Sequence, residues 1–141
     1  MAEASLITDD LQGLINVEFG PIEHEIEKGM VSKFAEAIED ANPLWQKVAP
    51  PTFPVVLRLE GFFEKLSTVK CSASRLLNGG NELEYYKPIK VGEVISVTGK
   101  LIDLQERAGR IGKMLFMTLE LIYKNQKDEV VATGRSTLIR Y

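Results

Sequence analysis

Apolar side chains recur with helical spacing in the first half of the chain. Four of them fall at i, i+3, i+4 and i+7 and therefore share one face of an α-helix: Val31, Phe34, Ala35 and Ile38. We expect this helix to begin near Gly29 and to end near Asp40 or Ala41. It does not run further, because Pro43 disfavours the α conformation at Asn42.

The stretch after this helix is predicted to be extended first and helical afterwards. Residues 49–54 read Ala-Pro-Pro-Thr-Phe-Pro. Each proline fixes φ and removes a backbone donor, so we expect stiff, extended chain there. A short second helix is expected over Val56–Leu66, because apolar residues at positions 59, 62, 63 and 66 mark one buried side.

The second half of the chain has the composition of β-strands. Four segments are rich in β-branched and aromatic residues: Glu82–Lys87, Glu93–Gln105, Gly112–Asn125 and Glu129–Tyr141. Turn-forming residues separate them at 88–92, 107–110 and 125–128. Connections this short require antiparallel neighbours, which predicts a meander. Residues 78–81, Asn-Gly-Gly-Asn, are interpreted as a turn before the first strand.

The strand over Gly112–Asn125 has one apolar face and one mixed face. The apolar face alternates along the strand: Leu115, Met117, Leu119, Leu121 and Tyr123. We expect the helix over residues 31–38 to cover this face and another subunit to meet the mixed face. The predicted fold class is therefore α+β, with a curved antiparallel sheet wrapped around a central helix.

Composition and charge narrow the possible functions. The 141 residues are 45% hydrophobic and 26% charged, which predicts one domain over residues 1–141 with about the first 15 residues at its periphery. The net charge of −3 argues against a nucleic-acid partner. No apolar run approaches the roughly 20 residues that span a bilayer, so no membrane association is expected. The single cysteine, Cys71, forms no internal disulfide, which favours a cytoplasmic location.

Three motifs, taken in order, resemble segments of one known family. Residues 34–44 resemble the helix and exit loop of the MaoC-like (R)-specific hydratases and dehydratases. Residues 49–53 resemble the Pro-Thr-Phe segment of the N-terminal-domain, FAS1-like dehydratase subfamily, and residues 84–93 resemble its strand and turn. The resemblance extends over residues 20–141 and implies a hot-dog fold. It also implies kinship with the small subunits of two-component 3-hydroxyacyl-thioester dehydratases.

The resemblance also implies a catalytic loop that has lost one of its two acid/base residues. In the family an Asp and a His share one water across an Asn-Pro turn, and they add it to a trans-2-enoyl thioester. Asp40 matches the Asp and Asn42 the residue that shapes the turn, so these two are the catalytic candidates. Trp45 stands at the His position, and indole is a hydrogen-bond donor only.

Each of these residues also has a purely structural interpretation. Asp40 is then a helix-end carboxylate bonded to loop amides, and Trp45 is an apolar plug over the loop. Alternatively, Trp45 lines an acyl tunnel, for which aromatic residues offer area and stiffness. The only histidine, His24, lies between glutamates before the helix and is interpreted as a surface residue.

Further substrate contacts are expected from two other segments. Pro51, Thr52 and Phe53 belong to the segment that resembles the dehydratase subfamily, and we expect them beside the substrate together with Trp45. Arg107 and Arg110 belong to a basic hairpin that would steer the phosphates of coenzyme A or of a carrier-protein arm. Their alternative role is a solvated surface. One histidine and one cysteine do not make a metal site, so neither metal nor cofactor is expected.

Three functions remain open on the sequence. The first is a (3R)-hydroxyacyl-CoA or acyl-carrier-protein dehydratase subunit that binds the acyl chain beside a catalytic MaoC-like partner. The second is a self-sufficient hydratase or an acyl-CoA thioesterase that uses Glu36, Glu39 or Asp40 to activate water. The third is a non-catalytic module for an acyl or sterol thioester. The expected assembly is a homodimer or a heterodimer with the catalytic subunit.

Overall fold

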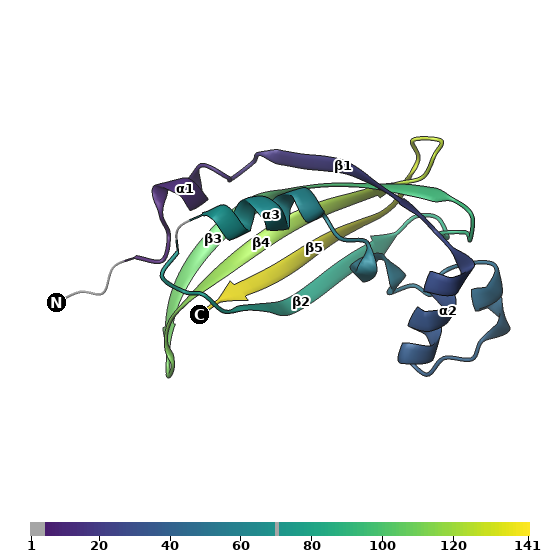
Figure 1. Ribbon diagram of the computed structural model, residues 1–141, viewed down its shortest axis with the longest axis horizontal. Coiled ribbons are helices and arrows are strands. Elements are labelled where there is room, and N and C mark those ends of the chain that lie inside the picture. The colour runs from purple at the N-terminus through teal and green to yellow at the C-terminus, as the bar shows by residue number, and fades with distance from the viewer. Residues whose placement is uncertain (1–4, 70) are drawn as a thin grey trace.

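The computed structural model describes residues 5–69 and 71–141, and a five-stranded antiparallel sheet dominates it (Figure 1). The strands are β1 (Glu18–Glu25), β2 (Leu76–Tyr85), β3 (Val94–Gly109), β4 (Gly112–Lys124) and β5 (Val130–Arg140). Their spatial order is β1-β3-β4-β5-β2. The last three strands along the chain are therefore a meander, as predicted, while β2 and β1 close its two sides.

The meander follows from strand alternation and tight turns. Gly109 pairs with Gly112, so Arg110 and Ile111 alone connect β3 to β4. Gly112 has a φ of 108°, which favours glycine at the exit of this turn. The predicted apolar face of β4 is buried throughout, from Leu115 to Tyr123. Alternation along β4 thus identified the core side correctly.

The helix that covers this face is α3 (Glu60–Thr68), and the expectation that the 31–38 helix covers it is wrong. Figure 1 shows α3 lying across the sheet, where it buries Phe62 and Leu66. Leu59, its N-cap residue, sits over Gly99 of β3: a Cβ on that glycine would lie 2.8 Å from Cδ2 of Leu59. The absent side chain at position 99 lets α3 approach the strands closely.

The first predicted helix exists but lies at one end of the sheet. It is α2 (Lys28–Ala37), and it buries only Val31 and Ala35. Its Phe34 ring packs edge to face on Phe53, with ring centroids 5.5 Å apart. Both helices have an apolar stripe, and the larger buried side chains of α3 fill the space over the sheet. A stripe shows that a helix is buried on one side, but not which surface it packs on.

Several boundaries differ from the sequence prediction. Residues 78–81 lie inside β2 as an irregularity of its pairing with β5, not as a turn before the strand. The sequence pattern does not predict β1, because Gly20 and Pro21 interrupt its alternation, and the register with β3 shifts between Phe19 and Ile22. A short helix, α1 (Asp9–Gln12), places Leu6, Leu11 and Leu14 in the core.

The proline-rich stretch is also more compact than predicted. Residues 51–52 form a turn, and Phe53 and Pro54 begin the 3₁₀ helix η2 (Phe53–Val56), in place of an extended chain. Another 3₁₀ helix, η1 (Pro43–Gln46), precedes this stretch. The second predicted helix accordingly divides into η2 and α3, which are separated by Leu57–Leu59. None of the helices in the described residues has the length and apolar character needed to span a membrane.

Candidate functional site

The loop that leaves α2 is built from local hydrogen bonds. The carboxylate Oδ1 of Asp40 accepts a bond from the backbone N–H of Asn42 at 3.1 Å. The side-chain Oδ1 of Asn42 accepts one from the N–H of Leu44 at 3.0 Å and so caps η1. Pro43 occupies the first turn of η1, where a backbone N–H would have no partner within the helix, so its missing donor does not destabilise η1. Asp40 and Asn42 therefore fold the loop through contacts to its own backbone.

Asp40, Asn42 and Trp45 share one open pocket of about 470 Å³. Its other lining residues all lie between Ser32 and Gln46, so one continuous segment makes the whole pocket. Glu36 and Glu39 add two further carboxylates. Asp40 is exposed to solvent. The structure thus brings together the three residues of the predicted catalytic loop, on an open and acidic surface.

An apolar groove of about 440 Å³ lies on the other side of Trp45. Two segments distant in sequence line it, one between Leu44 and Pro54 and the other between Tyr85 and Ile89. Apolar residues predominate along it: Leu44, Val48, Ala49, Pro50, Pro51, Pro54, Pro88 and Ile89. A concavity of this size and character is typical of sites for small apolar ligands.

Trp45 is the one residue that lines both the pocket and the groove. Its ring is half-buried against the core. The indole Nε1 is shielded from solvent and has no hydrogen-bond partner among the described residues. Trp45 therefore separates the carboxylates on one side from the apolar groove on the other.

Backbone and side-chain bonds hold the two walls of the groove together. The N–H of Ala49 donates to the carbonyl of Ile89 at 2.7 Å, and the N–H of Val91 donates to the carbonyl of Lys47 at 2.9 Å. A β-bridge between Val48 and Lys90 lies between these bonds. The groove is therefore a fixed feature of the fold, although each wall alone is a loop.

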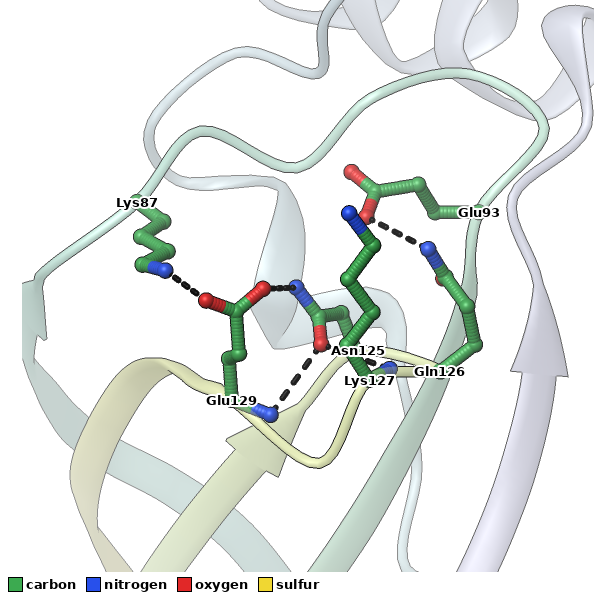
Figure 2. Close-up of polar contacts among 6 residues, drawn as sticks. All are labelled: Lys87, Glu93, Asn125, Gln126, Lys127 and Glu129. Atoms are coloured by element: carbon green, nitrogen blue, oxygen red, sulfur yellow. Dashed lines mark hydrogen bonds and ion pairs between the residues drawn. The ribbon is translucent and has the colours of Figure 1, made fainter.

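A polar cluster anchors the Lys87 side of the groove to the β4–β5 turn (Figure 2). The Lys87 ammonium pairs with Oε2 of Glu129. Oε1 of the same carboxylate accepts a bond from Asn125 Nδ2 at 3.1 Å. Asn125 is buried, and its Oδ1 accepts the N–H groups of Lys127 and Glu129. The hydrogen bond from Lys87, followed by that from Asn125, lowers the pKa of the Glu129 carboxyl.

Two tyrosines beside the groove differ in burial. Tyr123 of β4 is in the core, and burial raises its pKa to about 12, with a further contribution from Tyr85. Tyr85 is 44% exposed, and burial also raises its pKa. Both pair across the sheet with Ala132 of β5, so they lie on the same face. Both phenols therefore stay protonated at neutral pH.

The remaining predicted site residues are placed in three different environments. Pro51 lines the groove, whereas Thr52 is exposed beside it. Phe53 is fully buried against Phe34. Arg107 and Arg110 lie at the β3–β4 hairpin, at the opposite end of the sheet from α2 (Figure 1). The structure therefore does not bring the two arginines to the Asp40 loop.

Sequence reasoning missed the wall formed by Tyr85, Tyr86 and Leu44. All three are exposed apolar or aromatic residues, and Tyr86 is 58% exposed. The available signal was the pair of tyrosines directly before Lys87 and Pro88, where a strand ends. The His24 ring, in contrast, forms a hydrogen bond through Nε2 with the carbonyl of Arg58 at 3.0 Å, and His24 is not among the described residues that line the pocket or the groove.

The fold and the motif together define a hot-dog protein of the dehydratase type. The family model of the FAS1-like, dehydratase domain region matches residues 13–134, so the chain belongs to that family. A UPF0336 protein of Thermobifida fusca is 29% identical over 133 residues, which cover 84% of this chain and 85% of the relative. The family and the hot-dog class expected from the motifs are thereby confirmed.

Solved structures show the same fold at low sequence identity. The (3R)-hydroxyacyl-ACP dehydratase complex HadBC of Mycobacterium tuberculosis contains a chain with a TM-score of 0.74 and 16% identity. The match covers 89% of this chain and 96% of that one. The ChsH1–ChsH2 complex of the same organism gives a TM-score of 0.66 and 18% identity, covering 88% of both chains.

Proposed function

We propose that this chain is the acyl-binding, non-catalytic subunit of a two-component (R)-hydroxyacyl-thioester dehydratase. A second hot-dog subunit supplies the acid and the base that add water to the trans-2-enoyl thioester or remove it. The proposal rests chiefly on Trp45. This residue occupies the position of the family's histidine, and it also stands between the Asp40 pocket and the apolar groove.

The chemistry explains why one subunit is insufficient. Hydration needs a base to take a proton from water as its oxygen bonds to C3, and an acid to protonate C2. Asp40 is one carboxylate, already bonded to the N–H of Asn42, and the indole of Trp45 neither accepts nor exchanges a proton at neutral pH. The reacting carbons would therefore meet the acid and base of the partner.

The two edges of the sheet differ in their suitability for a partner. β1 is a poor edge for pairing, because Pro21 lacks a donor and Glu18, Glu23 and Glu25 are exposed. β2 has one neighbour, β5, and almost all of its residues are exposed. Leu76, Leu77 and Tyr85 are each 44–45% exposed on or beside this edge. An unprotected strand of this kind favours pairing with another chain.

The position of β2 supports the same assignment. Its last residue, Tyr85, lines the groove, so a partner seated along β2 would stand beside the bound acyl chain. HadBC and ChsH1–ChsH2 are both complexes named for two different proteins, which supports a heteromeric arrangement for this chain.

Reconstitution tests the proposal directly. The chain would be purified alone and also co-expressed with a hot-dog protein that carries the Asp-x-Asn-Pro-Leu/Ile-His motif. Hydration of crotonyl-CoA is then followed by loss of enoyl absorbance. We expect no turnover by the isolated chain and turnover by the complex that exceeds that of the catalytic subunit alone. Robust hydration by the isolated chain contradicts the proposal.

A charge placed in the groove tests whether the groove serves the complex. Leu44 is 51% exposed at the groove wall, so Leu44→Glu should fold normally but set a carboxylate against the acyl chain. We expect kcat/KM of the complex for a long-chain enoyl thioester to fall about tenfold or more. Ile111→Glu is the matched control, because Ile111 is exposed at the distant β3–β4 turn. Equal effects of the two variants would show that the groove is not used.

The three carboxylates of the Asp40 pocket favour one second candidate, an acyl-CoA thioesterase. Glu36, Glu39 and Asp40 line the same open pocket, where one of them would activate a water for attack on the thioester carbonyl. This activity releases free thiol, which a thiol reagent detects, whereas hydration does not. Thiol release by the isolated chain that Asp40→Asn abolishes would establish this candidate in place of the first.

A further inference from the structure

The groove has few hydrogen-bonding side chains, and most of them are already engaged. The Tyr86 hydroxyl donates to Oε2 of Glu84 at 2.8 Å. The Lys87 ammonium is paired with Glu129. The indole Nε1 of Trp45 is shielded from solvent, so a ligand in the groove does not reach it. Three of the four polar side chains along the groove are therefore unavailable to a ligand.

Tyr85 is the fourth, and its hydroxyl makes no hydrogen bond or ion pair to any residue that the structure describes. Its ring is 44% exposed and lines the groove. Burial raises its pKa, so the phenol is a neutral donor at neutral pH. A single free donor in an otherwise apolar groove is the usual means by which such a site fixes the orientation of its ligand.

We propose that Tyr85 donates the hydrogen bond that orients the acyl thioester in the groove, through the oxygen of the thioester carbonyl. This assignment rests on the proposed function for the class of ligand. The carbonyl oxygen is the acceptor that hydroxyacyl and enoyl thioesters have in common, so one donor serves both directions of the reaction. The alkyl chain would then lie along the apolar wall that includes Pro51 and Pro54.

Tyr85 lies where the ligand in the groove would come close to the proposed partner subunit. It is the last residue of β2, whose outer edge pairs with no other strand in the part of the chain that the structure describes. A carbonyl held there lies at the boundary between the groove and a partner seated on β2. Tyr85 is thus a positioning residue: it holds the thioester while the partner's groups act on the neighbouring carbons.

A pair of ligands that differ only in the carbonyl tests the assignment on the intact chain. The probes are S-decanoyl-pantetheine and the thioether S-decyl-pantetheine, and their affinities are measured by calorimetry. We expect the wild-type chain to prefer the thioester by about three- to tenfold, the range of one net hydrogen bond. Tyr85→Phe should remove this preference while leaving thioether affinity within about twofold of the wild type.

Tyr86→Phe is the matched control, because it removes the neighbouring hydroxyl that is already bonded to Glu84. It should retain the preference for the thioester. An equal affinity of the wild-type chain for both probes, binding of neither probe, or a preference that survives Tyr85→Phe would each overturn the assignment. Because these measurements use the isolated chain, they are independent of the reconstitution result: a complex that turns over without any Tyr85-dependent preference would leave the proposed function standing.

Discussion

The two concavities on either side of Trp45 are built in different ways. The Asp40 pocket comes from one continuous segment, Ser32–Gln46, and is shaped by bonds between side chains and nearby backbone groups. The apolar groove needs two segments that residues 55–84 separate along the chain, joined through the bonds of Ala49 to Ile89 and Val91 to Lys47. One site is local, whereas the other exists only in the folded protein.

Because its bonds are local, the Asp40 loop has a structural role whether or not it takes part in catalysis. The side-chain bond of Asp40 folds the loop after α2 and that of Asn42 caps η1, so both residues have a structural role that does not depend on a histidine at position 45. The groove has no such local role. Under the proposed function, the groove binds the acyl chain and the Asp40 loop forms a turn.

Truncation of Trp45 should have the largest effect on stability, because this side chain lines both the Asp40 pocket and the apolar groove. We expect Trp45→Ala to lower the free energy of unfolding by about 2 kcal/mol, less than for a fully buried tryptophan because the ring is half-buried. Urea denaturation measures the change. Trp45→Phe, which keeps an aromatic wall, should lose less than half as much. A loss below about 0.5 kcal/mol for Trp45→Ala would mean that the ring does not form the partition.

The contrast between the two sites also explains what the sequence could predict. The turn at Asn42 and Pro43 was predictable, because capping by Asn and the effect of a proline on the residue before it are local. The end of α2 was predicted too late: the helix ends at Ala37, before the expected end near Asp40, and Glu39 has a φ of 55°. The strands from Val94 onward were predictable because burial of one face imposes alternation. The family resemblance could be recognised from the sequence because its motifs are also local, being short and continuous.

The groove was not predictable, because it depends on which segments meet. Nothing in the pattern around Tyr85 indicates that this residue faces Pro51 across the groove. The same limit led to the wrong choice of covering helix: α2 and α3 both have an apolar stripe, and the space above Gly99 decides between them. The first half of β2 was likewise not predictable, since residues 78–81 resemble a turn.

Loss of the Asn42 side chain should have a smaller effect, confined to the Asp40 side. Asn42→Ala removes the acceptor for the N–H of Leu44, and we expect a loss of about 1 kcal/mol in the free energy of unfolding. Asn42→Asp is the control, because a carboxylate oxygen accepts the same bond. If Asp and Ala destabilise the chain equally, capping is not the role of Asn42, and a catalytic role for this position gains support.

The smallest effect is expected on the groove side, in the response of Glu129 to pH. Lys87 and Asn125 hold the pKa of its carboxyl below the ordinary value of 4.5. The unfolded chain therefore binds a proton at higher pH than the folded chain does. The stabilisation is present above the unfolded pKa and is lost as pH falls through the folded pKa. Because the carboxyl is in contact with solvent, the gain in stability is slight and decreases with salt.

A titration of Glu129 followed by carboxyl ¹³C chemical shift measures this effect without relying on stability. Lys87→Gln should move the midpoint back up towards 4.5, since the hydrogen bond from Lys87 is the largest cause of the shift. Lys127→Gln removes a charge of the same sign whose contribution is the least, and it should move the midpoint much less. If the two variants act alike, general charge rather than the bond from Lys87 sets the pKa. The pKa of Glu129 would then reflect the net charge around the β4–β5 turn rather than the contact that joins this turn to the groove.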